Sequence, residues 1–476
     1  MHVLVIGGGI SGLAAAHALQ EGGATVTLLE ASPRLGGKLL SGDIAGTTAV
    51  DLGAESMLAR RPEAVDLARA AGLGDDLCTP SAGAAIWSRG ELVPMPKGHV
   101  MGVPADPASL SGLLSAEGVA RAAEDATLPR TPVGEDVALG GYIAARLGEE
   151  VVDRLVEPLL GGVYAGNAYR ISMRAAVPQL YEAARSERSL LAGVRALQER
   201  AAGTTPAPAG PVFAGIAGGI GRLPEAVART CRAAGVRIRT TTPVRVIRRR
   251  PGGPLAGGPP GGPPWQAVLA GGDTVTADAV VVAAPAPEAA RLLAGEVPAA
   301  AEELESVEYA SMALITMAFR RADLHGAPLE GSGFLVPPVD GRHIKAATFS
   351  ARKWDWVAAQ DPSLFVLRTS IGRHHDDADL TRSDADLVRL SRDDLRDATG
   401  LGAKPVDTVV TRWNDGLPQY PVGHLERSAR IRHDLAALPG LAVCGAAYDG
   451  VGIPACIAGA RRAAARTLAQ ATPHGE

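Results

Sequence analysis

Residues 2–12 read HVLVIGGGISG, and this stretch decides the fold of a chain of 476 residues. The apolar run that ends at Ile6 is typical of a buried parallel strand, and the glycines after it form the pattern G-x-G-x-x-G. Residues 11–20 favour a helix, Gly22 and Gly23 end it, and residues 25–29 indicate the next strand. Strand, glycine-rich turn and helix in this order predict a βαβ unit that binds the pyrophosphate of a dinucleotide.

Each residue type in this turn has a physical role. Gly7 permits the tight turn, Gly9 lets the backbone approach a pyrophosphate, and Gly12 lets the helix pack closely on the strand. The helix N-terminus adds free N–H groups and partial positive charge for the phosphates. Glu30, at the tip of the second strand, can accept hydrogen bonds from ribose hydroxyls and repels a 2′-phosphate, which argues against NADP. The alternative is a glycine-rich turn that binds nothing.

Two further glycine-rich stretches fit the same ligand. Residues 34–38 read RLGGK, where the glycine pair suits close approach to the flavin half of a dinucleotide and the two cations are placed to meet phosphates. Residues 444–454 read CGAAYDGVGIP, at the opposite end of the chain. We expect both ends of the chain to fold over one cofactor, and this points to FAD.

Length and composition limit the number of domains and the classes of partner. A chain of this length usually forms more than one hydrophobic core, so two or three domains are expected. The formal net charge of -4 gives no general argument for binding nucleic acid or an anionic membrane. Four scattered cysteines without a C-x-x-C pattern predict reduced thiols in a cytoplasmic protein. The chain begins inside a strand, which leaves no room for a signal peptide, and it has no apolar run long enough to span a bilayer.

The rest of the chain predicts a second sheet and a helical block. We expect a hairpin over 86–93, a mainly helical block over 106–200 with a glycine-rich break at 161–166, and a Pro- and Gly-rich surface hairpin tip at 251–264. The remaining expected strands are 236–239, 244–247, 274–277, 280–285, 311–319, 333–336, 344–350, 364–370 and 441–444. The remaining expected helices are 63–71, 223–234, 384–399 and 454–469.

The glycine stretches and the strand at Val244 resemble the FAD-binding frame of the flavin amine oxidase and phytoene desaturase superfamily. Three further stretches narrow the resemblance: EPLLGGVYAGN at 157–167, KAATFS at 345–350 followed by Lys353-Trp354, and RW at 412–413 followed by LPQYPVGH at 417–424. Together they resemble the protoporphyrinogen and coproporphyrinogen III oxidase family of the Gram-positive bacterial type. The resemblance covers essentially the whole chain, except for residues 251–264.

This resemblance implies an α/β fold. A Rossmann-like, doubly wound FAD-binding domain would comprise residues 1–60, 213–298 and 425–476. A mixed-sheet α+β substrate-binding domain would comprise residues 61–98, 186–212 and 299–424, and residues 99–185 would form a helical insertion that covers the active site.

The resemblance also implies an activity in haem biosynthesis. FAD would convert coproporphyrinogen III to coproporphyrin III, with O2 as acceptor and hydrogen peroxide as product, removing six electrons in three rounds. The alternatives are a protoporphyrinogen IX oxidase, another flavin amine oxidase or desaturase-type enzyme, and a non-catalytic FAD-binding scaffold. Other haem-pathway enzymes as partners, peripheral membrane contact, and a monomeric or homodimeric state stay open.

The resemblance carries site residues over one by one. The flavin does the chemistry, so no catalytic side chain is assigned. The expected cofactor-binding residues are Gly7, Gly9, Gly12, Glu30, Gly37, Lys38, Val244 through its backbone, Gly445, Val451 and Ile453. The expected substrate-binding residues are Tyr164 beside the macrocycle, Leu335 and Trp354 as apolar walls, and the cations Lys97, Lys345 and Arg60 for propionates, with Arg61, Arg170 and Lys353 as further cations.

Each substrate-binding assignment has an ordinary structural alternative. The apolar residues would be core, the glycine-rich stretch a helix break, and the cations surface charges. No metal site is assigned, because His374-His375 with Asp376 and Asp377 is typical of a solvated loop.

Overall fold

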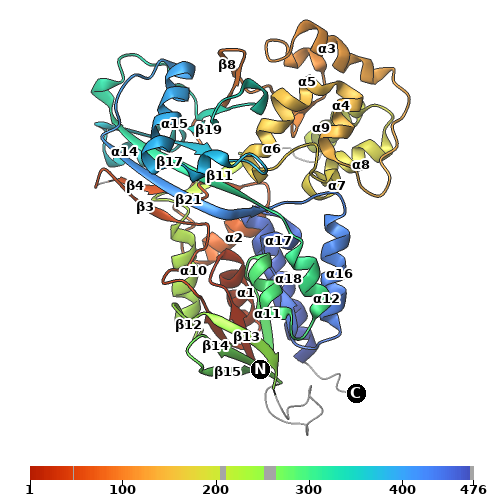
Figure 1. Ribbon diagram of the computed structural model, residues 1–476, viewed down its shortest axis with the longest axis vertical. Helices are drawn as coiled ribbons and strands as arrows, with labels where there is room; N and C mark the ends of the chain where they lie inside the picture. Colours follow the sequence, from red (N-terminus) through yellow and green to blue (C-terminus); the bar gives the residue numbers. More distant parts are fainter. Residues whose placement is uncertain (47, 204–210, 251–263, 472–476) are drawn as a thin grey trace.

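The computed structural model describes residues 1–46, 48–203, 211–250 and 264–471. Residues 251–263, almost all of the expected hairpin tip, lie outside this part. Figure 1 shows an elongated molecule with a parallel sheet and its helices in the lower part. A second sheet and a block of helices lie side by side in the upper part.

The lower part is built on a five-stranded parallel sheet. Its order is β12 (Arg237–Arg239), β2 (Thr25–Leu29), β1 (His2–Ile6), β16 (Ala279–Val282) and β22 (Leu441–Val443). Strand β1 pairs in parallel with β2 and β16, so segments far apart in the sequence meet here. The expected βαβ unit and the expected buried strands of this sheet are therefore confirmed.

Both faces of this sheet are covered. Val3 and Val5 of β1 pack on one side with the helices α1 (Ile10–Glu21), α2 (Pro62–Ala70), α10 (Arg222–Ala233) and α18 (Ile453–Ala471). Leu4 and Ile6 pack on the other side with a three-stranded sheet and three helices. These elements are β13 (Val244–Arg249), β14 (Trp265–Leu269), β15 (Thr274–Ala277), α11 (Ala286–Leu293), α12 (Pro298–Glu305) and α16 (His424–Ala436). A two-sided covering explains why β1 is apolar from Val3 to Ile6.

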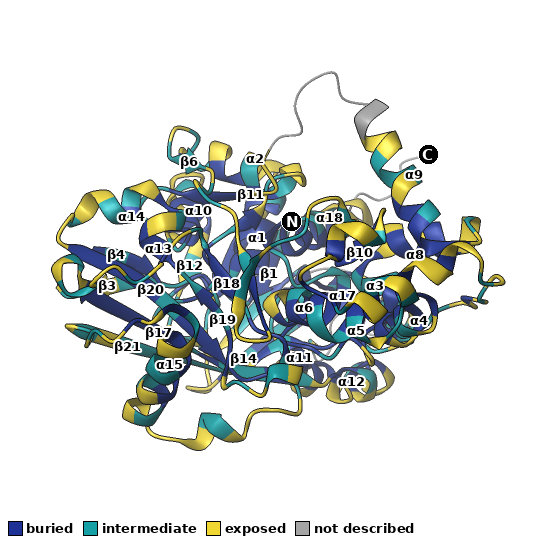
Figure 2. Ribbon diagram, turned by 90° about the horizontal axis from the view of Figure 1, so that it is seen from above, coloured by how far each residue is buried: buried dark blue, intermediate teal, exposed yellow. Residues whose placement is uncertain are grey.

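The upper sheet has seven strands and mixed pairing. Its order is β21 (Asp407–Pro418), β17 (Tyr309–Arg320), β20 (Leu364–Ile371), β19 (Ile344–Thr348), β18 (Gly333–Leu335), β7 (Ala85–Ser88) and β8 (Glu91–Pro94). Only β18 and β7 pair in parallel. The helices α13 (Ser350–Lys353), α14 (Asp355–Gln360) and α15 (Asp384–Thr399) accompany it, and exposed residues gather on the outward sides of α14 and α15 in Figure 2.

The sequence-based expectations for this sheet were mostly right. The hairpin of β7 and β8 turns at Arg89 and Gly90, both with positive φ, as the favoured two-residue turn requires. Strand β21 and helix α16 were not predicted. The remaining strands form two two-stranded ladders and one small three-stranded sheet. The ladders pair β3 (Ser41–Ile44) with β4 (Thr48–Asp51) and β9 (His99–Val100) with β10 (Val103–Pro104). The sheet has the order β5 (Met57–Leu58), β11 (Phe213–Ile216) and β6 (Leu77–Cys78).

The helical block also differs from expectation at one point. Its helices are α3 (Ala116–Ala123), α4 (Leu139–Leu147), α5 (Glu149–Val151), α6 (Glu157–Tyr164), α7 (Met173–Ala176), α8 (Pro178–Ser186) and α9 (Leu190–Gly203). The expected break at 161–166 is present, but it begins only after Tyr164, because α6 continues through Gly161 and Gly162. The helix ends at Ala165, which has φ 47 and donates its N–H to Gly161 O. Glycine weakens a helix without forbidding it, whereas the left-handed residue ends it.

Two helices move the expected domain boundaries. Helix α9 was assigned to the substrate-binding domain, but Leu190, Leu191 and Val194 pack in the core of the helical block. Helix α12 straddles the expected boundary after residue 298, and its residues pack on the parallel sheet. We therefore propose that the helical insertion continues to residue 203 and that the cofactor domain extends through Val307.

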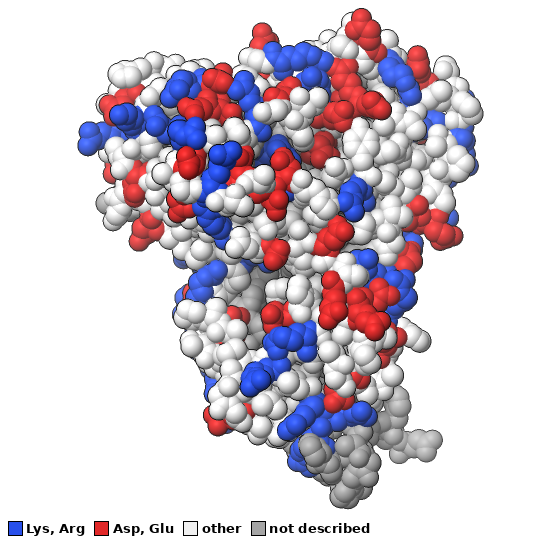
Figure 3. Space-filling view, viewed as in Figure 1, with Lys and Arg blue, Asp and Glu red and all other residues white. Residues whose placement is uncertain are grey.

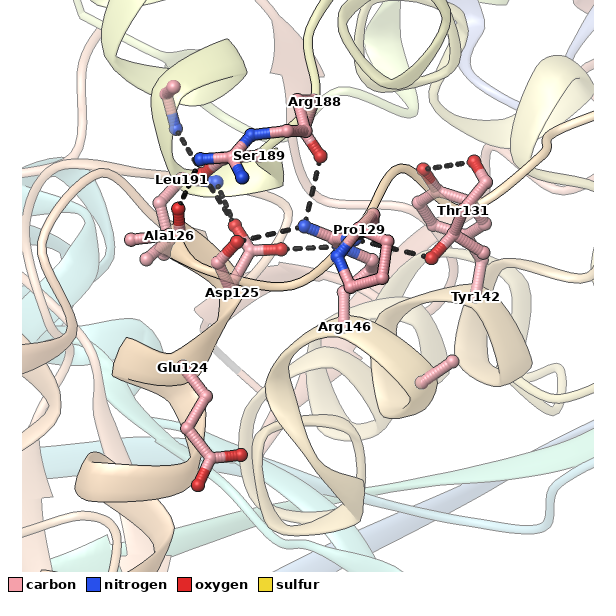
Figure 4. Close-up of polar contacts among 12 residues, drawn as sticks. Glu124, Asp125, Ala126, Pro129, Thr131, Tyr142, Arg146, Arg188, Ser189 and Leu191 are labelled. Carbon is pink, nitrogen blue, oxygen red and sulfur yellow. Dashed lines mark hydrogen bonds and ion pairs between the residues drawn. The ribbon is translucent and has the colours of Figure 1, made fainter.

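A buried ion pair holds the helical block together (Figure 4). Arg146 of α4 and Asp125 have fully buried side chains, and Arg146 Nε lies 2.5 Å from Asp125 Oδ1. The second carboxylate oxygen accepts from the Ser189 hydroxyl and the Leu191 N–H at 2.6 and 3.0 Å. Arg146 also donates to backbone carbonyls at Asp125, Pro129 and Arg188. The pair thus ties the end of α4 and the start of α9 to the segment around Asp125 and Pro129 that precedes α4.

Candidate flavin and substrate site

The first glycine turn is shaped by backbone contacts that only glycine permits. Gly7 has φ 108, and a Cβ there would lie 2.7 Å from Ala283 O. A Cβ on Gly12 would lie 1.8 Å from Gly7 O. These two glycines let α1 start directly against the end of β1.

Gly9 differs from its neighbours, because no residue that the structure describes comes close enough to require a glycine there. Its φ is -71°, and a Cβ would meet only Gly37 Cα, at 4.0 Å. The open space beside Gly9 faces the RLGGK stretch, where Gly36 N–H donates to Gly8 O at 2.8 Å and Gly37 has φ 57. Since packing does not require a glycine at this helix N-terminus, the missing side chain instead leaves room for a phosphate to approach the backbone closely.

Glu30 joins this turn to the strand that carries Val244. Its carboxylate accepts from the N–H groups of Gly8 and Ser32 at 2.6 and 2.7 Å. Its carbonyl accepts from Thr242 N–H at 2.8 Å, just before β13 begins at Val244. Val244 is buried, and its carbonyl accepts from Arg291 Nη2 at 2.9 Å. Because the carbonyl already has a partner, a ligand that binds the Val244 backbone would accept from its N–H group.

The last helix starts beside the first one. Helix α18 packs along α1 in the core of the lower part, and Figure 1 shows the two side by side. The thiol of Cys456 in α18 donates to Gly450 O at 3.5 Å, and Ser11 of α1 and the Lys38 ammonium lie close enough to influence this thiol. Burial lowers the pKa of Lys38 and raises the pKa of Cys456 to about 11. The structure therefore brings residues from three glycine-rich stretches together at one place.

The C-terminal turn before α18 is strained in the way that glycine allows. Gly445 has φ 136 and Gly450 has φ 137, and they flank the short helix α17 (Ala446–Asp449). Val451 follows, half-buried against the core of the helical block, and Ile453 is the first residue of α18. The free N–H groups at this helix start can face an anionic edge of a cofactor.

On the substrate side, α6 lies against the strands β18 and β19 of the upper sheet. A Cβ on Gly162 would lie 3.7 Å from Leu335 Cδ2, and Leu335 is only half-buried. Tyr164 packs edge-on against Tyr420 with ring centroids 5.6 Å apart. Its carbonyl accepts from Gln419 Nε2 at 2.9 Å. Burial raises the pKa of Tyr164 to about 12, so its hydroxyl stays protonated at neutral pH.

Lys345 lies in a bulge of β19, one of the two strands that α6 contacts. The pairing with β20 shifts between Ile344 and Ala346, and the Lys345 side chain is 5% exposed. Its ammonium donates to Gly372 O at 2.7 Å. Burial, and then the nearby guanidinium of Arg373, lower the pKa of Lys345 to about 7. Arg373 is itself buried and donates to Val336 O at 3.0 Å, so two cations sit together below the surface.

We expect Lys345 to make stability depend on pH. The ordinary lysine pKa of 10.5 holds in the unfolded chain, so between pH 7 and 10.5 the unfolded state binds an additional proton. Stability from this group therefore rises with pH, by up to about 1.4 kcal/mol per pH unit. Lys345→Met removes this contribution. Urea unfolding at pH 7, 8 and 9 should show its stability relative to the parent falling as pH rises. A constant difference would mean that Lys345 stays charged in the fold.

The other expected substrate residues lie elsewhere. Trp354 is 2% exposed and belongs to the core of the upper sheet, so its side chain is not at the face formed by α6 and Leu335. Lys97 and Arg60 are exposed on the surface. The structure therefore groups Tyr164, Leu335 and Lys345, and it does not bring the other three to them.

Two charged groups near the site were not singled out from the sequence. Arg373 was missed, although its place two residues after the mostly buried strand β20 was a usable signal. Glu55 is buried and meets both Lys353 and Arg368, and these cations hold the pKa of Glu55 below its usual value against the opposing effect of burial. Lys353, expected to bind a propionate, is thus committed to Glu55.

Comparisons with known proteins agree with this architecture. The model of a family described as flavin containing amine oxidoreductase matches residues 10–468. The chain belongs to this family, and it carries a flavin cofactor. It is 38% identical to the coproporphyrinogen III oxidase of Mycobacterium tuberculosis over 96% of this chain and 95% of that protein. The coproporphyrinogen III oxidase of Bacillus subtilis is 33% identical, with the same coverage.

A solved structure shows the same likeness. The crystal structure of a protein from Exiguobacterium sp. 255-15, named for protoporphyrinogen oxidase, superposes with a TM-score of 0.84 at 33% identity and covers 98% of each chain. The expected fold class and family are confirmed by these matches. Among the described residues, the structure has no helix that is both long and apolar enough to cross a membrane. Both signs of charge are interspersed over the face shown in Figure 3.

Proposed function

We propose that this chain is an FAD-dependent oxidase that converts coproporphyrinogen III to coproporphyrin III in haem biosynthesis. The observation that carries the proposal is the sequence similarity, over nearly the full length, to coproporphyrinogen III oxidases from two organisms, at 38% and 33% identity. The match to the flavin containing amine oxidoreductase family supports it. The face between α6 and the upper sheet supports it, because that face combines apolar surface with buried cations. A flat tetrapyrrole with carboxylate arms needs both.

The residues present fit FAD. The open space at Gly9 and the backbone N–H groups of α1 suit the pyrophosphate, and Glu30, with Val244 nearby, suits the adenosine half. The remaining proposed contacts are Gly7, Gly12, Gly37, Lys38, Gly445, Val451 and Ile453. FAD, when bound, supplies hydride acceptance and reoxidation by O2.

The chain's own residues orient the substrate in this proposal. Leu335 and the glycine face of α6 provide a flat apolar contact, because Gly162 adds no side chain. Tyr164 keeps its proton at neutral pH and can donate a hydrogen bond. Lys345 binds a propionate, and this raises the pKa of Lys345, because an opposite charge favours the charged ammonium form.

The decisive test is anaerobic mixing of the purified yellow protein with coproporphyrinogen III and, separately, with protoporphyrinogen IX. We expect both porphyrinogens to bleach the flavin absorbance and air to restore it, with porphyrin fluorescence appearing at least about tenfold faster from coproporphyrinogen III. A tenfold difference corresponds to about 1.4 kcal/mol, which one additional charge-assisted hydrogen bond can supply.

Other outcomes point to the alternatives. Preference for protoporphyrinogen IX would keep the chemistry and change the substrate, and the Exiguobacterium structure is the observation that favours this second candidate. Bleaching by neither would leave another flavin amine oxidase-type enzyme or a non-catalytic scaffold. We also propose a cytoplasmic location, with O2 as the acceptor and a monomer or homodimer as the assembly.

A further inference from the structure

Two histidines and a carboxylate from distant segments meet at the junction of the upper sheet and the helical block. Glu308 stands just before β17, and His374 and His375 follow β20. One ligand-type atom from each of the three residues lies within 4.8 Å of the others. The interpretation of these histidines as a solvated loop holds for His375, but the His374 side chain is only 7% exposed.

The two imidazoles face the same oxygen. His374 Nε2 lies 3.1 Å from Glu308 Oε2, and His375 Nε2 lies 3.9 Å from that atom. The ring centroids of the histidines are 3.9 Å apart, with 44° between the ring planes. Two nitrogens and one oxygen therefore converge from one side.

This convergence depends on an unusual backbone conformation. Successive side chains of an extended segment point to opposite sides. His375 instead has φ 64, a left-handed conformation that is costly for a residue with a Cβ. The turn is also fixed, because Arg373 and Asp376 exchange backbone hydrogen bonds and His374 N–H donates to Ala165 O at 2.7 Å. Such strain occurs where a surrounding structure or a ligand requires it.

We propose that Glu308, His374 and His375 form a binding site for one divalent transition-metal ion of the Zn²⁺ type. Imidazole nitrogen and carboxylate oxygen are ordinary zinc ligands, and three protein ligands leave one position for water. Mg²⁺ and Ca²⁺ prefer oxygen ligands and fit this set poorly. The site adjoins the proposed substrate face, since His374 follows Arg373 and donates its N–H to Ala165 O, but metal binding by these three side chains does not depend on the proposed oxidase activity.

Arg170 competes with the metal for this site. Its Nη1 contacts His375 Nε2, and its Nη2 lies 3.6 Å from Glu308 Oε2. The Arg170 side chain is 51% exposed, so it is free to turn toward solvent when a metal ion binds. A guanidinium that must leave weakens metal binding, because it removes a favourable charge pair and leaves a like charge near the ion.

The test uses the flavin-loaded full-length protein after chelator treatment, with Zn²⁺ added in competition with a chromogenic chelator. We expect one Zn²⁺ per chain, at least tenfold weaker binding in His375→Ala and in Glu308→Gln, and several-fold tighter binding in Arg170→Gln. His343→Ala is the matched control, because His343 is another exposed histidine paired with a carboxylate, Asp379 at 2.6 Å, and should leave binding unchanged. Thermal melting checks that each variant is folded.

A second readout reports the ligand type. Cu²⁺ in place of Zn²⁺ should give an electron paramagnetic resonance spectrum with coupling to two imidazole nitrogens, reduced to one in His375→Ala. The proposal is overturned if Zn²⁺ binding is equal in the parent, His375→Ala and Glu308→Gln. It is also overturned if Arg170→Gln weakens binding, since Arg170 would then support the metal ion and not compete with it.

Discussion

Gly12→Ala is expected to remove most of the bound flavin. The new Cβ would lie 1.8 Å from Gly7 O and 2.9 Å from Gly7 C, and both atoms belong to the backbone of the turn that starts α1. No flexible side chain can yield, so the helix must shift away from β1 and the N–H groups at its start move with it. Overpacking of this kind costs about 1–3 kcal/mol or more, which corresponds to flavin binding weakened on the order of 100-fold.

Flavin retained through purification, and a titration of the flavin-free protein, would measure this effect. Gly141→Ala is the matched control, because Gly141 is also the third residue of its helix, α4. A Cβ at Gly141 would meet nothing within 4 Å, so the same substitution should leave flavin binding unchanged and stabilise the helix by about 0.8–1 kcal/mol. Full flavin content in Gly12→Ala would contradict the close helix–strand contact.

Arg146→Met is expected to destabilise the helical block by about 3–5 kcal/mol. The substitution leaves the carboxylate of Asp125 fully buried without its cation and removes the donors to three backbone carbonyls. Urea unfolding followed by circular dichroism measures the loss. Hydrogen exchange should locate it in α3, α4 and the start of α9, because a block with its own core can open separately from the rest.

Two comparisons separate this effect from a general loss of charge. Arg185→Met in the same block removes an exposed ion pair with Glu182 and should cost no more than about 1 kcal/mol. The double variant Asp125→Ala, Arg146→Met should be more stable than Arg146→Met alone, since it buries no unpaired charge. Equal losses in the two Arg variants would show that the Asp125–Arg146 pair contributes little.

The cofactor side of the site was largely predictable because its determinants are local. The G-x-G-x-x-G turn and the two strands around it follow from residues that are adjacent in the sequence. The stretches at 34–38 and 444–454 carry their own glycines with positive φ. Their grouping at one place was inferred from resemblance, and the packing of α18 along α1 brings it about.

The substrate side was less predictable because its determinants are not local. Lys345 contacts its partners because β19 has a bulge, which the pattern of apolar residues in the sequence does not predict. Arg373 affects the pKa of Lys345 only because the fold places the two side chains beside each other. Trp354 is an aromatic residue of the kind that often lines a ligand pocket, but it lies in the core of the upper sheet. Strand β21 was missed because its burial alternates weakly, with exposed residues among half-buried ones.

By itself the sequence determined the dinucleotide turn, the buried parallel strands, the helical block and the class of fold, because glycine φ angles and apolar runs act over a few residues. Only the tertiary structure decided the partners of the buried charges, Asp125 with Arg146 and Glu55 with Lys353 and Arg368, and it also brought the exposed Glu308 to two histidines. The physical reason is that a charge is buried only where an opposite charge or a hydrogen bond meets it, and that partner comes from wherever the chain has folded back.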